Sequence, residues 1–378
     1  MDGQKWPAGC YNMLGQAIAT SPPNAVIRLS KGVFYEESLI IQKNLIIQGL
    51  GREQTLIKQY AEVDSFFLRI SSGSDVKIQA QLENLTIESP LTNGIQIMDK
   101  AHITVINTII RSKGGTGLIG KGFSTVILED SAVFAGGGGV SIDDSTTIKL
   151  FNSNVSASTL SGGIGIKIFS NSIAILENCQ ILGHESGLVV GGSASVSIKN
   201  CQISKALHFG IFAQGRTRLS VINSSISNNG YEIGYGIGGI EWAVLDFSNV
   251  IISNNRQSGL LVSGSATATV QGSTIRGNGT ALDCRQLGPE FNQICNGVMV
   301  DNNAQVVIAD TLITDNTDWG IAAKLKRCGY YEDNFAGKIV FTGENKIQGN
   351  NKSGNQNGKG NPGNHPFKNL PDGQVCVP

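Results

Sequence analysis

The sequence predicts an all-β solenoid, in which short strands coil through stacked rungs. A unit of about 22 residues recurs from Gly94 to Asn350, and its clearest copies are GLVVGGSASVSIKNCQISKALHF and GIFAQGRTRLSVINSSISNN. Within each copy the apolar residues alternate in short runs, which is typical of strands rather than helices. Each copy holds three such runs, so one copy describes one rung of a three-strand coil.

The register of the repeat holds over ten copies. One slot in each copy carries a residue suited to a tight corner: Asn84, Asn107, Asp130, Asn152, Asn178, Asn200, Asn223, Asn249, Gly272 and Asp310. Eight of the nine intervals between these residues are 22 to 26 residues long, and an apolar residue follows three places later in every copy. We therefore expect about ten regular rungs.

The corner slot also indicates how neighbouring rungs interact. Asn tolerates the left-handed backbone conformation of a two-residue corner, and its amide can bond to the Asn of the next rung. An apolar-alternating strand after Gly, then a strand ending at Asn, then a third strand, resembles the pectate-lyase-like right-handed parallel β-helix superfamily. The opening segment, from Gly15-Gln-Ala-Ile to Leu45-Ile-Ile-Gln-Gly, is similar to the start of many bacterial right-handed β-helix proteins. The resemblance implies the fold and an asparagine ladder, and it transfers no catalytic residue.

The chain divides into three predicted parts. Residues 1–50 hold a cap helix and the first strands, residues 51–350 form the β-helix, and residues 351–378 form an extended C-terminal tail. The helix is expected in YNMLGQAIATS, because Leu14, Ala17 and Ile18 share one face and Pro22 follows. A cap is expected because an open solenoid end exposes unpaired strand edges.

Three insertions interrupt the regular repeat. They lie at 156–163, 228–235 and 277–296, each between the third strand of one rung and the first strand of the next. Insertions at one corner build a wall on one side of a solenoid, and that side is often the binding face.

Composition excludes several function classes. Lys plus Arg equals Asp plus Glu at 29 each, and a neutral chain without a basic run argues against nucleic-acid binding. We find no run of about 18 apolar residues that would span a membrane. The four histidines show no metal-ligand spacing, so we expect neither a metal nor another cofactor.

The seven cysteines favour an oxidising compartment. Two pairings, Cys284 with Cys295 and Cys328 with Cys376, would staple irregular segments as disulfides, which are typical of secreted or periplasmic proteins. The numbered chain shows no signal peptide. Cys179 and Cys201 occupy an inward slot in adjacent rungs, where a buried thiol stack or a disulfide is sterically allowed. Cys10 has no evident partner.

In the superfamily that this sequence resembles, substrate lies along the outer face of the first strand. Alternation turns the second and fourth residues after the register Gly outward. The charged residues on this face or at its rim are our catalytic candidates: Lys121, Asp143, Lys167, Glu185 and His208. A lysine base with a carboxylate suits β-elimination on a uronic acid, and two carboxylates suit glycoside hydrolysis. Cross-strand ion pairs without a catalytic role are the alternative.

The same face carries an apolar stripe of Phe212, Ile240, Leu261 and Met299. An exterior apolar stripe is either covered or binds a ligand, and the 277–296 insertion and the C-terminal tail are the expected covers. The predicted substrate-binding residues are Asp144, Phe212, Gln214, Arg216, Glu241 and Trp242.

The sequence thus supports one leading hypothesis, a secreted or periplasmic β-helix protein that acts on or binds a polysaccharide. As an enzyme it would be a lyase, hydrolase or epimerase on an acidic glycan. The alternatives are a non-catalytic binding or scaffold protein of the cell surface or periplasm, and self-assembly through the apolar stripe. Intact signatures of polygalacturonases, calcium-dependent pectate lyases and alginate epimerases are missing, which leaves enzyme activity open.

Overall fold

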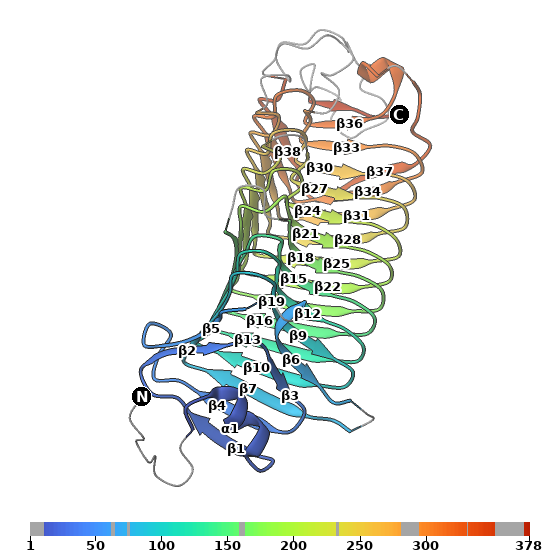
Figure 1. Cartoon of the computed structure of the whole chain (residues 1–378). Helices are drawn as coiled ribbons and strands as arrows, with labels where there is room; N and C mark the ends of the chain where they lie inside the picture. Colours follow the sequence, from blue (N-terminus) through green and yellow to red (C-terminus); the bar gives the residue numbers. More distant parts are fainter. Residues whose placement is uncertain are drawn as a thin grey trace. The chain divides into compact units, whose positions relative to one another are not determined.

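The chain folds as a parallel β-solenoid with three sheets, as predicted (Figure 1). The computed structural model describes residues 11–61, 65–73, 76–158, 163–231, 234–280, 295–330, 332–351 and 374–378. The chain separates into two compact units, residues 1–163 and 164–378, and each is described by itself. We name the three sheets A, B and C in the order in which the chain enters them.

The first unit contains one helix, α1 (Leu14–Thr20), and three parallel sheets. Sheet A consists of β1 (Ala25–Arg28), β4 (Leu45–Gln48), β7 (Gln79–Glu83), β10 (His102–Ile106), β13 (Thr125–Glu129) and β16 (Thr147–Phe151). Sheet B consists of β2 (Gly32–Glu36), β5 (Thr55–Gln59), β8 (Thr86–Ser89), β11 (Ile109–Ser112), β14 (Ala132–Ala135) and β17 (Asn154–Ala157). Sheet C consists of β3 (Leu39–Ile41), β6 (Phe66–Ser71), β9 (Asn93–Met98), β12 (Thr116–Gly120) and β15 (Gly138–Ile142).

The second unit repeats the same three-sided path. Sheet A consists of β19 (Ile173–Glu177), β22 (Ser195–Lys199), β25 (Arg218–Ile222), β28 (Val244–Ser248), β31 (Thr267–Gln271), β34 (Gln305–Ala309) and β37 (Lys338–Thr342). Sheet B consists of β20 (Gln180–Leu182), β23 (Gln202–Ser204), β26 (Ser225–Ser227), β29 (Ile251–Ser253), β32 (Thr274–Arg276), β35 (Leu312–Thr314) and β38 (Lys346–Gln348). Sheet C consists of β18 (Ile164–Ile168), β21 (Ser186–Val190), β24 (Ile211–Ala213), β27 (Ile237–Gly239), β30 (Leu260–Val262), β33 (Val298–Val300), β36 (Ile321–Ala323) and β39 (Val375–Cys376). The short 3-10 helix η2 (Lys326–Cys328) follows β36.

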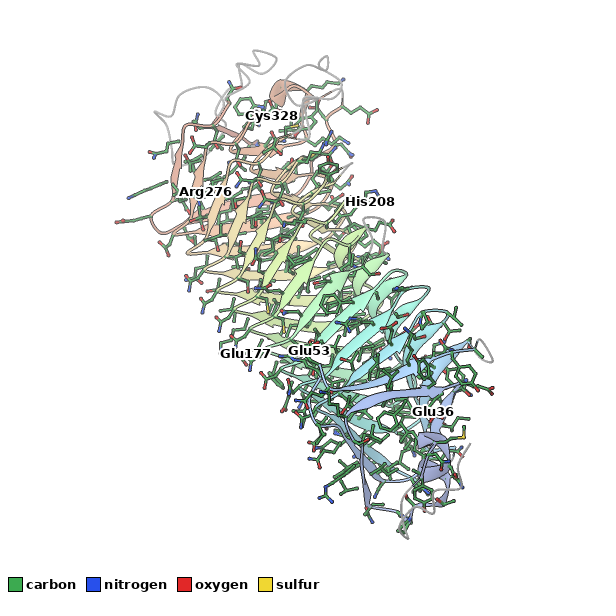
Figure 2. The ribbon with its side chains drawn as sticks, turned by 60° about the vertical axis from the view of Figure 1, so that its left-hand side comes forward. Glu36, Glu53, Glu177, His208, Arg276 and Cys328 are labelled. Atoms are coloured by element: carbon green, nitrogen blue, oxygen red, sulfur yellow. A yellow bond between two sulfur atoms is a disulfide. The ribbon has the colours of Figure 1, made fainter. Side chains whose placement is uncertain are left out.

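The predicted cap helix is confirmed. Leu14, Ala17 and Ile18 are its buried residues. Its first backbone N–H groups are satisfied by a carboxylate, because Glu36 Oε1 accepts from the Leu14 N–H at 2.6 Å and Glu36 Oε2 from the Gly15 N–H at 3.3 Å. Figure 2 shows Glu36 beside this helix. A carboxylate at a helix N-terminus satisfies otherwise unpaired donors and complements the helix dipole.

The interior is filled by the inward residues that the repeat predicts. In β21, Leu188 and Val190 are fully buried whereas Val189 between them is partly exposed. Neighbouring strands pair in register, so that Val189 lies beside Phe212 of β24. Columns of like side chains therefore run along each face, and the face of every outward residue follows from its place in the repeat.

The predicted asparagine corner is also confirmed. All ten residues of the slot have φ between 44° and 57°, in the left-handed region. Asparagine amides in this slot bond to the preceding rung, as in Asn107 Nδ2 to Asn84 Oδ1 at 2.7 Å and Asn200 Nδ2 to Asn178 Oδ1 at 3.2 Å. This outer ladder lies at the surface between sheets A and B.

A second ladder, which the sequence analysis missed, runs inside the second unit where sheet B ends. It consists of Asn229, Asn255, Asn278, Asn316, Asn350 and Gln374. Each asparagine Nδ2 donates to the side-chain oxygen of the next member at 2.8 to 3.1 Å, and the same oxygen accepts from the backbone N–H of the donor residue. All six side chains are buried. A chain of satisfied polar groups in a low-dielectric interior is strong because every member has its partners.

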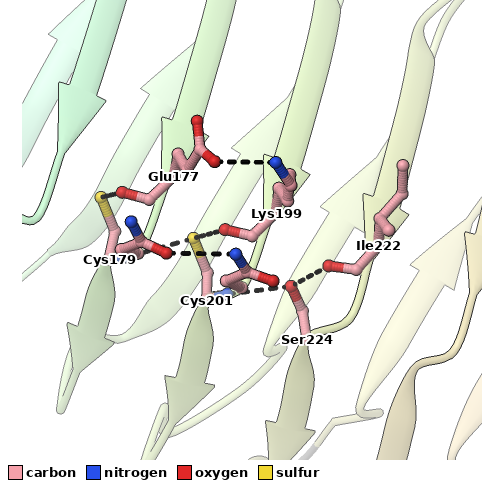
Figure 3. A network of polar contacts seen from close by, with 8 residues as sticks. Glu177, Cys179, Lys199, Cys201, Ile222 and Ser224 are labelled. Carbon is pink, nitrogen blue, oxygen red and sulfur yellow. Dashed lines mark hydrogen bonds and ion pairs between the residues drawn. The ribbon is translucent and has the colours of Figure 1, made fainter.

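The cysteines of the inward slot are reduced thiols, which agrees with the thiol-stack interpretation. Cys201 Sγ accepts from the Cys179 N–H at 3.3 Å, and the Cys201 N–H donates to Ser224 Oγ at 3.0 Å (Figure 3). Each thiol donates to the carbonyl two residues earlier, at 3.2 to 3.3 Å. Ser224 makes the same bond, to the carbonyl of Ile222 at 2.8 Å, so cysteine replaces serine in this column without loss of a contact.

We expect the buried ladder to be a main source of stability in the second unit. In Asn278→Ala, the backbone N–H and the Nδ2 of Asn255 lose the oxygen that accepts from both, at 3.1 and 2.9 Å. Two buried unsatisfied donors should lower the free energy of unfolding by about 2–5 kcal/mol, measured by urea denaturation.

The control is Asn249→Gly, which removes the outer-ladder bond from Asn249 to Asn223. Glycine suits this position because its backbone is left-handed, and the same slot of the next rung already carries Gly272. We expect its cost to stay below about 1 kcal/mol. Equal losses in the two variants would contradict the special role of the buried ladder.

Candidate functional site

The predicted site residues belong to both units. Lys121, Asp143 and Asp144 lie in the first unit, at the ends of β12 and β15 where sheet C leads back to sheet A. Asp144 has φ of 62°, and its Oδ2 accepts from the Gly122 N–H at 2.9 Å. Asp143 Oδ1 accepts from the Asp144 N–H at 2.8 Å. Both carboxylates thus help to form the corner, and their predicted contacts with substrate stay a prediction.

The remaining candidates lie in the second unit, on or beside sheet C. We call the outward surface of β18, β21, β24 and β27, together with the residues that directly flank these strands, the sheet C face. Lys167 on β18 is exposed, and Val189, Phe212 and Gln214 of the next two rungs are partly exposed. The inward and outward assignment that the repeat predicts for these residues is confirmed.

Aromatic side chains gather at the centre of the sheet C face. The rings of Phe209 and Phe212 are 4.8 Å apart, and Phe209 stacks on Tyr235 at 5.9 Å. Gly238 allows this packing, because a Cβ on it would lie 3.1 Å from Phe212 Cδ2 and 3.4 Å from Phe209 Cε1. All three aromatic side chains are partly exposed, so the cluster presents ring surface to the outside.

One rim of this face carries an ion pair. His208 Nδ1 lies 3.5 Å from Glu185 Oε1, and the side chains are 34% and 50% exposed. The sequence analysis placed both residues on this face or at its rim, and the structure brings them together as a pair. A histidine beside a carboxylate is an arrangement that occurs in general acid–base catalysis.

The opposite rim carries a cation over an indole ring. The Arg216 guanidinium carbon lies 5.9 Å from the ring centre of Trp242, which is 58% exposed. Glu241 has a structural task, because its Oε2 accepts from the Gly215 N–H at 2.9 Å. A second cation, Lys167, lies with its Nζ 5.0 Å from the Phe169 ring centre. Both cations therefore have an aromatic neighbour that holds them at the face.

The far end of the apolar stripe is covered by the chain itself. Met299 and Ala322 are buried against Cys328, Tyr330 and Cys376. The predicted Cys328–Cys376 disulfide is confirmed, with a Cα–Cα distance of 5.7 Å. The expectation that intramolecular segments cover the stripe therefore holds at Met299. The greater part of the 277–296 insertion and of the tail, together with Cys284 and Cys10, lies outside the described residues.

A buried carboxyl lies where the open and covered parts of sheet C meet. Asp301 follows β33 and is 8% exposed. Burial raises its pKa, while hydrogen bonds from Ser263 and Asn302 and the charge of Lys324 oppose that shift. Burial also raises the pKa of Tyr235 to about 12, with a smaller contribution from the charge of Asp301. Asp301 is the fourth residue after Gly297, so the repeat places it outward and does not predict its burial.

Within the parts of the chain that the structure describes, His, Cys, Asp and Glu form no group of three that could hold a metal ion. No helix among those residues has the length and apolar character needed to cross a membrane.

Comparison with known proteins identifies the family. The model described as "Right handed beta helix region" matches residues 62–196 and 186–366. This chain belongs to the right-handed β-helix family. Among curated proteins none matches the sequence of this β-helix protein.

Solved structures share the fold at low sequence identity. The A-module of the mannuronan C-5 epimerase AlgE4 from Azotobacter vinelandii is 13% identical, with a TM-score of 0.59, and the match covers 86% of this chain and 90% of that module. The A-module of AlgE6 from the same organism is 14% identical, with a TM-score of 0.55, covering 87% and 93%. Tailspike protein 3 of bacteriophage CBA120 is 12% identical, with a TM-score of 0.51, covering 87% of this chain and 57% of the tailspike. These likenesses show that the β-helix of this chain has the same fold.

The raised pKa of Asp301 predicts a pH-dependent stability. Because its folded pKa lies above its ordinary value near 3.8, the protonated carboxyl stabilises the fold fully at low pH, and this contribution is lost as pH rises through the folded pKa. Asp301→Asn mimics the protonated form. Its free energy of unfolding relative to the wild type should therefore increase from pH 4 to pH 7, measured by urea denaturation.

The control is Asp246→Asn, which neutralises an exposed carboxylate on β28. Because Asp246 is exposed, we expect the difference between this variant and the wild type to change less with pH than that of Asp301→Asn. A flat difference for Asp301→Asn would contradict the role assigned to burial.

Proposed function

We propose that the sheet C face of residues 164–378 binds an acidic polysaccharide. The observation that carries the proposal is the partly exposed cluster of Phe209, Phe212 and Tyr235, flanked by Trp242 on one rim and by the Glu185–His208 pair on the other. Exposed aromatic rings combined with a few polar groups are typical of ligand sites, since the rings bury apolar ligand surface and the polar groups orient it. The C–H faces of sugar rings supply such apolar surface.

The charges on this face favour an acidic ligand. Lys167, two rungs before Phe212, and Arg216, at the corner that follows Phe212, add cationic groups to this face, each near an aromatic ring. Glu241 adds a negative charge at this rim, and a bond from the Gly215 N–H fixes the position of its carboxylate. Gln214, on the rung between Lys167 and Trp242, adds an amide that can bond hydroxyl groups.

The repeat matches a polymeric ligand. Each rung advances the face by about 4.8 Å, so successive rungs present their groups at regular intervals along one line. Beyond the sheet C face, Cys328 and Cys376 and the residues packed with them cover the outward side of sheet C at Met299 and Ala322. This cover limits the exposed stretch at that end. Two of the structures with the same fold are named as mannuronan epimerases, and their substrate class is consistent with the proposal.

Turnover of the bound glycan is the second candidate function, and the Glu185–His208 pair favours it. In this scheme His208 transfers a proton at the rim of the face, Glu185 orients it, and Lys167 stabilises the charge that develops on a uronate carboxylate. Lys121 and Asp143 stay candidate catalytic residues of the first unit. The disulfide supports a secreted or periplasmic site of action, because such bonds persist in oxidising compartments.

The binding proposal is tested by calorimetric titration with hexamannuronate, hexaguluronate and hexagalacturonate. We expect at least one to bind, and Trp242→Ala to weaken that binding by about threefold to tenfold, which corresponds to about 0.5–1.5 kcal/mol for one stacking contact. Lys167→Ala should also weaken binding, and the affinity that it loses should grow as the salt concentration is lowered, because the contribution of Lys167 is electrostatic.

Tyr35→Ala is the matched control, since Tyr35 on sheet B of the first unit is also 58% exposed. Binding by none of the three probes, or equal loss in Tyr35→Ala and Trp242→Ala, would contradict the proposal. Unsaturated products, new reducing ends or altered C-5 configuration in the same mixtures would establish turnover. Turnover that survives His208→Ala would exclude the role given to His208, and binding without turnover would leave a non-catalytic binding protein.

A further inference from the structure

A second feature of the second unit, separate from the sheet C face, is a hollow along the corner between sheets A and B. It has a volume of about 590 Å³ and extends over four successive rungs. Its outward lining is the outer asparagine ladder (Asn178, Asn200, Asn223, Asn249) and the adjacent outward residues of sheet B (Gln180, Gln202, Ser225, Ile251), and the inward residues Cys179, Cys201 and Ser224 between them also line it. Figure 3 shows part of this corner, between Glu177 and Ser224.

Most of the outward side chains that line this hollow are polar, and none of them is charged. Amides and one hydroxyl make up seven of its eight outward side chains. The nearest charges, Glu177 and Lys199, neutralise each other in an ion pair of 2.9 Å at the edge of sheet A. A charged ligand would therefore find no unbalanced counter-charge here, and the lining offers nearly as much apolar surface as polar surface.

The amides are held in fixed positions. Left-handed corners place the asparagines, and ladder bonds join Asn200 to Asn178 at 3.2 Å and Asn249 to Asn223 at 3.3 Å. An amide carries two N–H donors and an oxygen with two lone pairs, so a single ladder bond leaves donor and acceptor capacity directed outward at Asn200. In-register pairing of Gln180 with Gln202, and of Gln202 with Ser225, repeats this pattern at each rung.

An added peptide strand does not fit this corner. The backbone groups of β20, β23 and β26 point along the stack and pair with the neighbouring rungs, so the corner offers side chains rather than a strand edge. A chain of neutral sugars fits better, because every hydroxyl is both a donor and an acceptor and the units recur along a line. We propose that this amide-lined corner is a second glycan-binding site, specific for a neutral polysaccharide.

The proposal is tested on the full chain by titration with cellohexaose, xylohexaose, maltohexaose and mannohexaose, followed by calorimetry and by two-dimensional amide NMR. We expect at least one of these probes to bind. Gln180→Ala combined with Gln202→Ala should weaken that binding at least fivefold, because two exposed amides that contact the ligand are removed. Both residues are exposed, so the double variant should keep the wild-type melting temperature.

The matched control is Gln305→Ala, which removes an exposed glutamine from sheet A of the same unit outside the hollow. Binding of the neutral probe should be unchanged in this variant and in Trp242→Ala. The proposal is overturned if none of the four probes binds, or if the double variant binds as the wild type does. It is also overturned if Trp242→Ala abolishes neutral-probe binding, since the sheet C face would then be the site. If only the acidic probes fail to bind, the proposed function of the sheet C face is contradicted and the amide-lined corner is supported by its own probe.

Discussion

Hydrogen bonding from each rung to the next is the interaction on which the whole structure depends. In each unit every strand pairs in parallel with its copy one rung away, so the spacing and the register of the repeat are set by backbone geometry. Register in turn decides which side chains share a column. Phe212 lies between Val189 and Gly238 for this reason, and the aromatic cluster can form because Gly238 leaves space for the rings.

Polar columns within the stack extend the same principle to side chains. In the second unit the buried asparagines pass one hydrogen bond to the next from Asn229 to Gln374, and the inward cysteines and serines cap backbone N–H groups of the preceding rung. Such a column is tolerated in a core because every side-chain amide has hydrogen-bond partners on both sides. The last asparagine of the column, Asn350, has no further asparagine of the column to bond and needs another partner. Gln374, directly before β39, fills that place for Asn350, so the C-terminal segment completes the ladder as well as sheet C.

Much of this fold could be predicted from the sequence because periodicity reports register directly. The corner at Asn107, the cap helix with Leu14 and the outward place of Phe212 all followed from counting. The buried ladder was missed, although a signal exists in the recurring pairs Asn228-Asn229, Asn254-Asn255, Gly277-Asn278, Asp315-Asn316 and Gly349-Asn350. Their first members have φ from 54° to 63°, which marks a second left-handed corner with the inward asparagine behind it.

The candidate site was less predictable because its character comes from segments outside the repeat. Burial of Met299 depends on the return of the chain at Cys328 and Cys376, and the order of strands does not specify where that return lies. The repeat placed Glu185 and His208 on the same face or its rim, where the structure brings them into contact. The backbone hydrogen bonds of Asp144 and Glu241 depend on corner geometry, which the sequence pattern does not reveal.

The central claim is that a glycan lies along the sheet C face of residues 164–378, and hydroxyl-radical footprinting tests it most directly. The full chain would be oxidised with and without a saturating acidic hexasaccharide, and the modified side chains would be located by mass spectrometry. The account predicts lower oxidation of Trp242, Phe209 and Phe212 in the presence of the sugar, with Tyr35 unchanged. Unchanged oxidation of those three side chains while the sugar is bound would contradict it.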